Sequence, residues 1–159
     1  MKDWFPLLLQ SLSHNFRAKH FLSQSLVVGT VLLTTATCAQ AQEAPERISL
    51  NTRSPLVELT GRSGGTKRDP SCAGFIADKP NYLVDVTEDS DRRFQLEGAT
   101  DSTLLIVNAK GQKFCVKADK LSNGKVEIPG RWSRGLYQIF VGSQTQARSS
   151  YRLTIEPIN

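Results

Sequence analysis

The sequence predicts an all-β domain, a sandwich or barrel of about eight to ten short strands, behind an N-terminal signal peptide. Three observations predict this class. Runs of alternating apolar and polar residues recur along the chain at intervals of roughly ten residues. Residues typical of tight turns separate these runs, and no stretch after residue 41 shows a helical period with caps.

The first 41 residues have the three parts of a cleavable secretory leader. A basic region comes first, the uncharged run Leu26–Thr37 follows, and small residues at Ala39 and Ala41 complete the pattern. We expect cleavage between Ala41 and Gln42, a flexible tail over residues 42–47 and a folded domain over 48–159. The apolar run is about half of the ~20 residues that span a bilayer, so no stable membrane span is expected in the mature form.

Two alternatives for the leader stay open. A second apolar cluster at residues 4–9 makes the front of the leader long, so that either the start codon lies later or the basic region is extended. Lipidation of Cys38 is the other alternative, but Thr35 and Thr37 do not match the residues that usually precede a lipidated cysteine. In each case the expected location is the periplasm or the outside of the cell.

Removal of the leader changes the charge and the chemistry of the chain. The leader holds three of the 20 basic residues, one of the 15 acidic residues, both histidines and Cys38. The mature chain then carries a net charge of about +3 without a basic cluster, so no nucleic-acid partner is expected. Its lack of histidine removes Ser-His-Asp and Cys-His catalysis, histidine-ligated zinc and the commonest general base.

Carboxylates are the catalytic groups that remain. The mature sequence has no phosphate-binding loop, no dinucleotide-binding glycine motif and no nucleophile elbow. A small hydrolase with two acids facing each other across a cleft stays open as a remote alternative. We therefore expect no enzyme and no cofactor.

The expected strands follow one another along the chain. Alternation predicts strands with one buried face at residues 82–87, 93–97 and 151–156. Residues 104–107 and 136–141 are apolar almost throughout, which is typical of central strands covered on both faces. The turn signals predict hairpins at Asn108–Gly111 and Asn123–Gly124, a longer loop at Gly61, Gly64 and Gly65, and the end of a short strand 126–128 at Pro129–Gly130.

Cys72 and Cys115 are the two cysteines of the mature chain. An even pair of cysteines in a small exported domain predicts a disulfide. In the chain-entropy model a bridge across 43 positions stabilises the fold by about 4 kcal/mol. Two buried free thiols are the alternative.

Three acids in one loop, Glu88, Asp89 and Asp91, form a candidate calcium site. Their spacing does not match the EF-hand loop, and Arg92 follows directly, so a solvated turn is the favoured interpretation. Asp101 is expected to hydrogen-bond its own backbone in a turn.

Arg131, Trp132 and Arg134 place an aromatic ring between two guanidinium groups, directly before a strong strand. A sugar or a peptide could stack on such a platform. The favoured interpretation is that Trp132 covers one end of the core while the arginines lie in solvent, because large aromatic rings dominate protein cores.

The last sixty residues carry a recognisable pattern, made of Asp101–Ile106, Gly111, Phe114–Cys115, Trp132, Gly135–Gly142 and Tyr151–Ile155. This pattern resembles the bacterial pre-peptidase C-terminal (PPC) domain. Upstream, Gly64–Gly65 and Cys72–Ile76 resemble its stand-alone cyanobacterial form, so that the resemblance, with moderately specific motifs, covers roughly residues 56–156.

This resemblance implies an antiparallel, jelly-roll-like β-sandwich without catalytic activity, which assists secretion, adhesion or ligand binding. Many members carry an acidic pair after the position of Cys115, but here only Asp119 matches, so no metal site is expected. The favoured function is an exported module that binds carbohydrate, envelope material or a protein partner. A structural or accessory envelope protein without a small ligand is the alternative.

Overall fold

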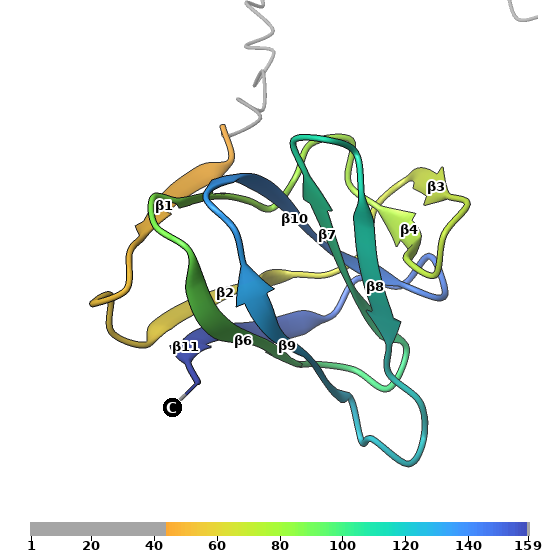
Figure 1. The fold of residues 1–159 in the computed structure, drawn as a ribbon. Coiled ribbons are helices and arrows are strands. Elements are labelled where there is room, and N and C mark those ends of the chain that lie inside the picture. Colours follow the sequence, from red (N-terminus) through yellow and green to blue (C-terminus); the bar gives the residue numbers. More distant parts are fainter. Residues whose placement is uncertain (1–43, 159) are drawn as a thin grey trace, which may run out of the picture. The chain divides into compact units, whose positions relative to one another are not determined.

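The computed structural model describes residues 44–158, which form eleven β-strands in two sheets and contain no helix (Figure 1). The signal peptide, the cleavage site between Ala41 and Gln42, and Cys38 lie outside the described residues. The predicted β-sandwich is confirmed, and its strand count is slightly above the expected eight to ten.

The larger sheet has seven strands, and β10 lies at its centre. β10 pairs antiparallel with β5 on one side and with β7 on the other. β1 and β8 are the outer strands, and a single bridge joins the end of β10 to β4. The seven strands are β1 (Glu46–Leu50), β3 (Lys67–Asp69), β4 (Gly74–Ile76), β5 (Tyr82–Val86), β7 (Ser102–Asn108), β8 (Lys113–Lys117) and β10 (Gly135–Ser143).

The smaller sheet has four antiparallel strands in the order β2, β11, β6, β9. β6 and β11 are therefore central, and β2 and β9 form its edges. The four strands are β2 (Val57–Arg62), β6 (Ser90–Glu97), β9 (Lys125–Trp132) and β11 (Ser150–Pro157).

The main core lies between the two sheets, as the alternation of the sequence predicts. Tyr82, Val84 and Val86 of β5 are buried there, as are Phe94 and Leu96 of β6. The inward face of β11 completes it with Tyr151, Leu153 and Ile155. Alternation is informative here because successive side chains of a strand point to opposite faces.

A second, smaller core covers the outer face of the larger sheet. Residues 67–76, here called the cap, contain the β3–β4 hairpin, which is drawn beside β8 in Figure 1, and Ala73 and Ile76 of the cap pack against β7 and β10. Leu105 and Phe140 are buried under the cap, whereas Leu104 and Ile139 face the main core. The prediction of cover on both faces is therefore confirmed for residues 104–106 and 139–141, whereas Gln138 is exposed and Leu136 and Val107 are half-buried.

Local turn signals were less reliable than the strand pattern. Asn108–Gly111 does form the β7–β8 hairpin turn. Asn123 and Gly124 take positive φ angles of 49° and 80°, but they lie in the connection from β8 to β9, which belong to different sheets. Pro129 and Gly130 lie inside β9 and not at its end, which is tolerated because β9 is an edge strand.

The first strand also departs from the expectation. It begins at Glu46, two residues before the expected start of the domain, and Glu46 and Arg47 pair with Tyr82 and Leu83. The pairing of β1 with β5 is parallel in an otherwise mostly antiparallel fold. The long connection through the smaller sheet permits this direction, since parallel neighbours need a crossover.

Arg92 is a basic residue of β6 that is buried. Its side chain is 1% exposed and donates hydrogen bonds to the carbonyl oxygens of Asn51 and Ser54. The Arg92 carbonyl in turn accepts a hydrogen bond from Trp132 Nε1 at 3.0 Å. Burial lowers the pKa of Arg92. The guanidinium therefore ties the loop between β1 and β2 to the smaller sheet.

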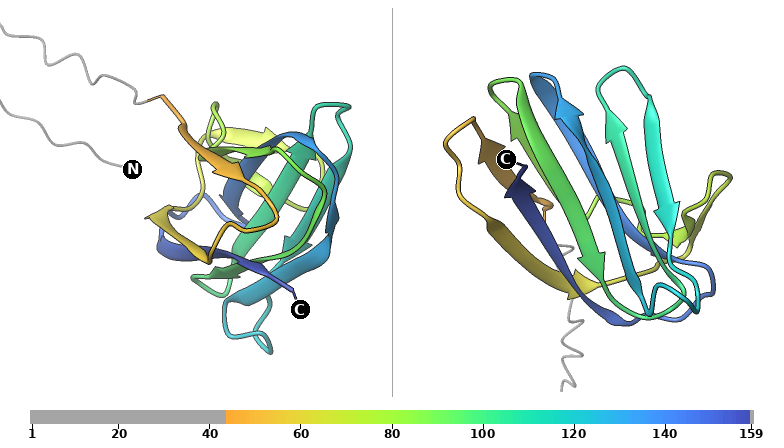
Figure 2. Two further views of the ribbon diagram at one scale, coloured as in Figure 1. Left: turned by 60° about the vertical axis from the view of Figure 1, so that its left-hand side comes forward. Right: turned by 60° about the horizontal axis from the view of Figure 1, so that its bottom comes forward.

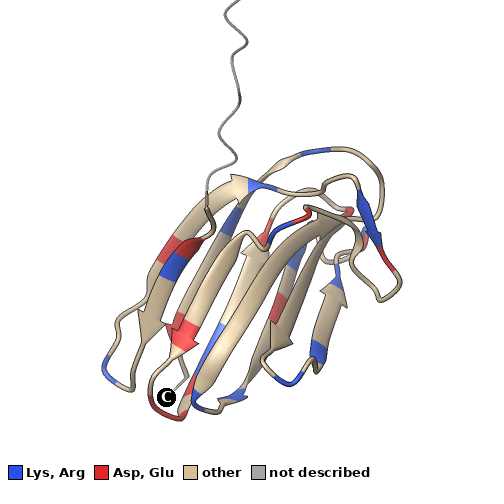
Figure 3. Cartoon of the chain, turned by 90° about the horizontal axis from the view of Figure 1, so that it is seen from above, with Lys and Arg blue, Asp and Glu red and all other residues tan. Residues whose placement is uncertain are grey.

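Four connections lie at one end of the sandwich, namely those between β1 and β2, β5 and β6, β7 and β8, and β9 and β10 (Figure 2, right). Basic and acidic segments are interspersed over strands and loops (Figure 3). Because binding sites often lie on loops that a rigid scaffold holds in place, a binding site is expected at this end of the sandwich.

Candidate functional site

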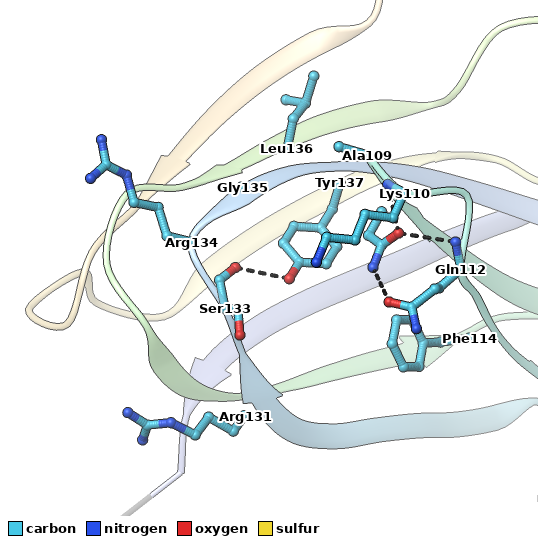
Figure 4. Close-up of a pocket in the computed structure, with 11 residues that line it drawn as sticks. Ala109, Lys110, Gln112, Phe114, Arg131, Ser133, Arg134, Gly135, Leu136 and Tyr137 are labelled. Carbon is cyan, nitrogen blue, oxygen red and sulfur yellow. Dashed lines mark hydrogen bonds between the residues drawn. The ribbon is translucent and has the colours of Figure 1, made fainter.

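A concave pocket of about 230 Å³ opens between the β7–β8 turn and the β9–β10 turn (Figure 4). Two of its lining residues, Arg131 and Arg134, were predicted as ligand-binding from the sequence. The remaining lining residues are Asn108, Ala109, Lys110, Gln112, Phe114, Ser133, Gly135, Leu136 and Tyr137.

The β7–β8 turn is held by the side chain of Asn108. Its Oδ1 accepts hydrogen bonds from the backbone N–H groups of Lys110 and Gln112, each at 3.0 Å. Its Nδ2 donates to Gln112 Oε1 at 2.7 Å (Figure 4). Gly111 has a φ of 78°, a conformation that glycine adopts without strain. The turn therefore presents Lys110 and Gln112 from a fixed backbone.

The β9–β10 turn is fixed from two sides. The backbone N–H of Arg134 donates to Asp89 Oδ1 at 2.8 Å, which ties this turn to the β5–β6 loop. Tyr137 Oη donates to the Ser133 carbonyl at 2.8 Å (Figure 4). Burial, with a contribution from the charge of Asp89, raises the pKa of Tyr137, so this phenol stays protonated at neutral pH.

Trp132 lies beneath the pocket and is not part of its surface. Its side chain is only 4% exposed, and its ring packs against Phe94, Phe114 and Tyr137 with centroids 4.6, 5.3 and 5.3 Å away. The stacking platform proposed for Trp132 is therefore wrong, and the favoured interpretation as a core residue is correct. The aromatic ring that reaches the pocket is Phe114 of β8, at 40% exposure.

The charged residues that line the pocket are all cationic. They are Lys110, Arg131 and Arg134, and no described residue with a carboxylate lines the pocket. Arg131 Nη1 forms an exposed ion pair with Asp91 Oδ2 at 3.2 Å. Within residues 44–158, neither Lys110 nor the Arg134 guanidinium forms an ion pair.

The three acids proposed as calcium ligands bind protein groups instead. Glu88 accepts a hydrogen bond from Thr52 Oγ1 at 2.9 Å, while Asp89 and Asp91 engage the β9–β10 segment as described above. Residues 44–158 contain no group of three acids, cysteines or histidines close enough to hold a metal ion. Glu88 and Asp89 lie in the connection between β5 and β6, as expected, but the prediction is wrong for Asp91, which lies in β6 and pairs with Arg131 of β9.

Asp101 and Asp119 stabilise loops. Asp101 Oδ2 accepts hydrogen bonds from the hydroxyls of Thr145 and Ser143, each at 2.7 Å, and these bonds lower the pKa of Asp101. Its main partners are thus on and beyond β10, which the local-turn prediction did not anticipate. The backbone N–H groups of Ser122 and Leu121 donate to Asp119 Oδ1 and lower the pKa of Asp119.

The predicted disulfide between Cys72 and Cys115 is present and joins the cap to β8. The two Cα atoms are 5.9 Å apart, within the usual range for a disulfide. Beside it, Lys113 Nζ lies 2.8 Å from Asp69 Oδ2, and Ser71 also donates to Asp69. Burial alone would raise the pKa of Asp69, but these hydrogen bonds outweigh it and hold that pKa below its usual range.

The carboxyl groups of the described residues can be compared with the pair of acids that a hydrolase needs. A carboxylate pair needs one acid with a raised pKa and a second acid in the same cleft. Within the described residues, every carboxyl group with a displaced pKa has a lowered one. No described residue with a carboxylate lines the pocket between the two turns.

Comparison with known proteins supports the fold. No protein-family profile and no curated protein matches the chain. The chain is similar in structure to the pre-peptidase C-terminal domain of collagenase from Bacillus anthracis, with 12% sequence identity and a TM-score of 0.50; the match covers 72% of this chain and 98% of that one. A periplasmic inhibitor of g-type lysozyme from Aeromonas hydrophila aligns at 11% identity and a TM-score of 0.36, over 71% and 98% of the two chains.

The chain therefore has a PPC-like β-sandwich fold, in agreement with the resemblance seen in its sequence. The assignment to a stand-alone cyanobacterial type stays a prediction. Residues 44–158 include no helix of the length and hydrophobicity needed to cross a membrane.

Proposed function

We propose that this protein is an exported, non-catalytic binding module that recognises carbohydrate of the cell envelope or its surroundings. The observation that supports this most is the pocket between the β7–β8 and β9–β10 turns. It combines an exposed aromatic ring, Phe114, with hydrogen-bonding side chains on two turns that are already fixed. Concave sites with an apolar surface and a few convergent polar groups are typical of ligand sites.

Export is the second part of the proposal. The composition of residues 1–41 supports a signal peptide that is cleaved between Ala41 and Gln42. The disulfide supports a compartment in which thiols oxidise. N-terminal sequencing of the protein recovered from the periplasm or the medium should begin at Gln42. Retention of the whole leader in the cytoplasm would contradict this part.

Binding is tested with the full chain, expressed with its own leader and recovered after export. A glycan array that includes envelope polysaccharides should give at least one specific signal. Phe114→Leu should weaken that signal, because leucine fills the apolar space but has no ring face for a sugar. Leu121→Ala, at a residue 95% exposed on another loop, is the control and should leave it unchanged. Indifference to every glycan would refute the proposal and favour an accessory envelope protein.

A further inference from the structure

We infer that the pocket between the two turns accepts an acidic sugar unit, one that bears a carboxylate, sulfate or phosphate group. This inference rests on the binding function proposed above and specifies its ligand. Its basis is the charge of the lining, which includes Lys110, Arg131 and Arg134 but no described carboxylate. The rest of the described chain mixes both signs (Figure 3), whereas every charged residue of this lining is a cation. The neighbouring acids Asp89 and Asp91 contact the backbone of Arg134 and the side chain of Arg131 from outside the lining.

Two of these three cations are available to a ligand. Among residues 44–158, Lys110 and the guanidinium of Arg134 have no acidic partner within ion-pair distance. Arg131 is paired with Asp91, but both side chains are more than half exposed, and such pairs exchange partners at little cost. In Figure 4 the guanidinium groups of Arg131 and Arg134 extend away from Lys110 and Phe114, so the two arginines lie at the rim of the pocket.

The hydrogen-bonding groups of the lining are mostly donors. Lys110, Arg131 and Arg134 can only donate. The Asn108 side chain uses its Oδ1 and Nδ2 within the turn, and Gln112 uses its Oε1 there, which leaves the Gln112 Nε2 as a further donor. A ligand rich in acceptors complements such a lining, and carboxylates, sulfates and phosphates are the strongest acceptors available.

Size and shape favour a sugar unit over a peptide. The pocket of about 230 Å³ is smaller than the roughly 300–1,000 Å³ of sites that enclose drug-sized ligands, so it holds one ring-sized group. Phe114 lines the same pocket and is 40% exposed, and sugar rings pack on aromatic rings through their C–H groups. The adjoining strand β8 is an edge, but its lysines at both ends, Lys113 and Lys117, disfavour the addition of a peptide strand.

The test measures binding of the exported full chain to four polymers by affinity electrophoresis. Polygalacturonate and dextran sulfate carry carboxylate and sulfate groups, dextran is the neutral counterpart of dextran sulfate, and poly-glutamate is an acidic peptide. Inorganic phosphate is added as a competitor to detect recognition of a free anion. We expect binding to at least one acidic polysaccharide and at least about tenfold weaker binding to dextran, as for the loss of one charge-assisted hydrogen bond.

The variants separate the pocket from general charge. Lys110→Gln combined with Arg134→Gln should weaken binding of the acidic polysaccharide by about tenfold or more. Lys79→Gln combined with Arg148→Gln removes the same charge from residues that line a different pocket and should change binding less than about twofold. Equal losses in both variants would show attraction to the whole surface and would overturn the inference.

Other outcomes are equally decisive. Binding of neutral glycans that is unaffected by Lys110→Gln and Arg134→Gln would overturn the acidic ligand and leave the proposed carbohydrate binding intact. Poly-glutamate bound as tightly as the polysaccharides, or inorganic phosphate bound as tightly per anionic group as the sugar unit, would also overturn the assignment to a sugar. Absence of binding to every polymer and to every glycan of the array would refute the proposed function as well.

Discussion

The two cores of this sandwich are stabilised in different ways. The main core between the sheets contains 18 buried hydrophobic residues, whereas the core under the cap contains four, Ala73, Ile76, Leu105 and Phe140. Burial of apolar area contributes about 1.5–3 kcal/mol for each large side chain. The main core therefore has ample driving force of its own, and the cap core has little.

The cap is held by specific links that the main core does not need. The Cys72–Cys115 disulfide, the Lys113–Asp69 ion pair and a hydrogen bond from Thr103 Oγ1 to the Ala73 carbonyl at 2.8 Å attach it to the larger sheet. Gly142 of β10 makes close contact possible, since a Cβ there would lie 2.4 Å from the Ala73 carbonyl oxygen. Ordering a backbone costs about 1–2 kcal/mol per residue, so a short segment over a small core depends on such links.

Loss of a large side chain from the main core should have the largest effect. Phe94 is fully buried and packs on Trp132, so Phe94→Ala leaves a cavity that the two sheets cannot close. We expect a loss of about 3–5 kcal/mol in the free energy of unfolding, measured with urea. Leu121→Ala, at an exposed position, is the control and should change it by less than about 0.5 kcal/mol. A loss below about 1 kcal/mol for Phe94→Ala would contradict the packing described.

Removal of the disulfide should act mainly on the cap. Cys72→Ser combined with Cys115→Ser removes a link across 43 positions, and we expect a loss of about 2–4 kcal/mol. The variant should also become sensitive to trypsin at Lys67 and Arg68, which are exposed residues of β3. Native-state hydrogen exchange should show lost protection in β3 and β4 while β6 and β11 stay protected. Uniform loss of protection would contradict the separation into two cores.

Neighbouring leucines on one strand compare the two cores directly. Leu104 and Leu105 of β7 are both buried, the first in the main core and the second under the cap. We expect Leu104→Ala to cost about 3–4 kcal/mol and Leu105→Ala about 2 kcal/mol, because the cap can settle into the space. Urea unfolding of the two variants measures the difference. Equal costs would mean that the cap is as rigid as the sheets.

The main core could be predicted from the sequence, because period-two alternation reports which face of a strand is buried. This holds for Phe94 and Leu96 and for the whole inward face of β11. Arg92 occupies a position on the same buried face of β6, but a charged side chain at that position interrupts the apolar–polar pattern of the sequence. The pattern therefore does not predict the burial of Arg92. Its burial depends on carbonyl groups of the loop between β1 and β2, 38 and 41 positions away in the chain.

The cap and the pocket could be predicted only in part, because both depend on contacts between distant segments. The disulfide followed from composition and compartment, but the three-residue strands β3 and β4 are too short for alternation to register. Arg131 and Arg134 were predicted as ligand-binding, whereas Lys110 and Phe114 were not. The pairing of β7 with β10 and the contact of Phe114 with Trp132 bring their turn and strand to the β9–β10 turn. A turn motif also does not determine whether the two strands that it joins pair with each other. Asn123–Gly124 lies between β8 and β9, which belong to different sheets.

The smallest expected effect concerns the ion pair beside the disulfide. Asp69→Asn keeps the shape of the side chain but removes the charge that Lys113 and Ser71 stabilise. Lys113 is 40% exposed, so solvent screens part of the interaction, and we expect a loss of about 1 kcal/mol at pH 7. Asp78→Asn, at an exposed acid of the following loop, is the control and should have no measurable effect.

The pH dependence identifies the charge of Asp69 as the cause. The folded-state pKa of Asp69 is lowered, so its contribution is fully present above the unfolded value of about 3.9 and is lost as the pH falls through the folded value. Urea midpoints of the wild-type chain and of Asp69→Asn should therefore differ at pH 7 and converge below about pH 4. A constant difference down to pH 2 would show that Asp69 acts through packing or hydrogen-bond geometry and not through its charge. In that case the disulfide, and not the ion pair, would be the main tether of the cap to β8.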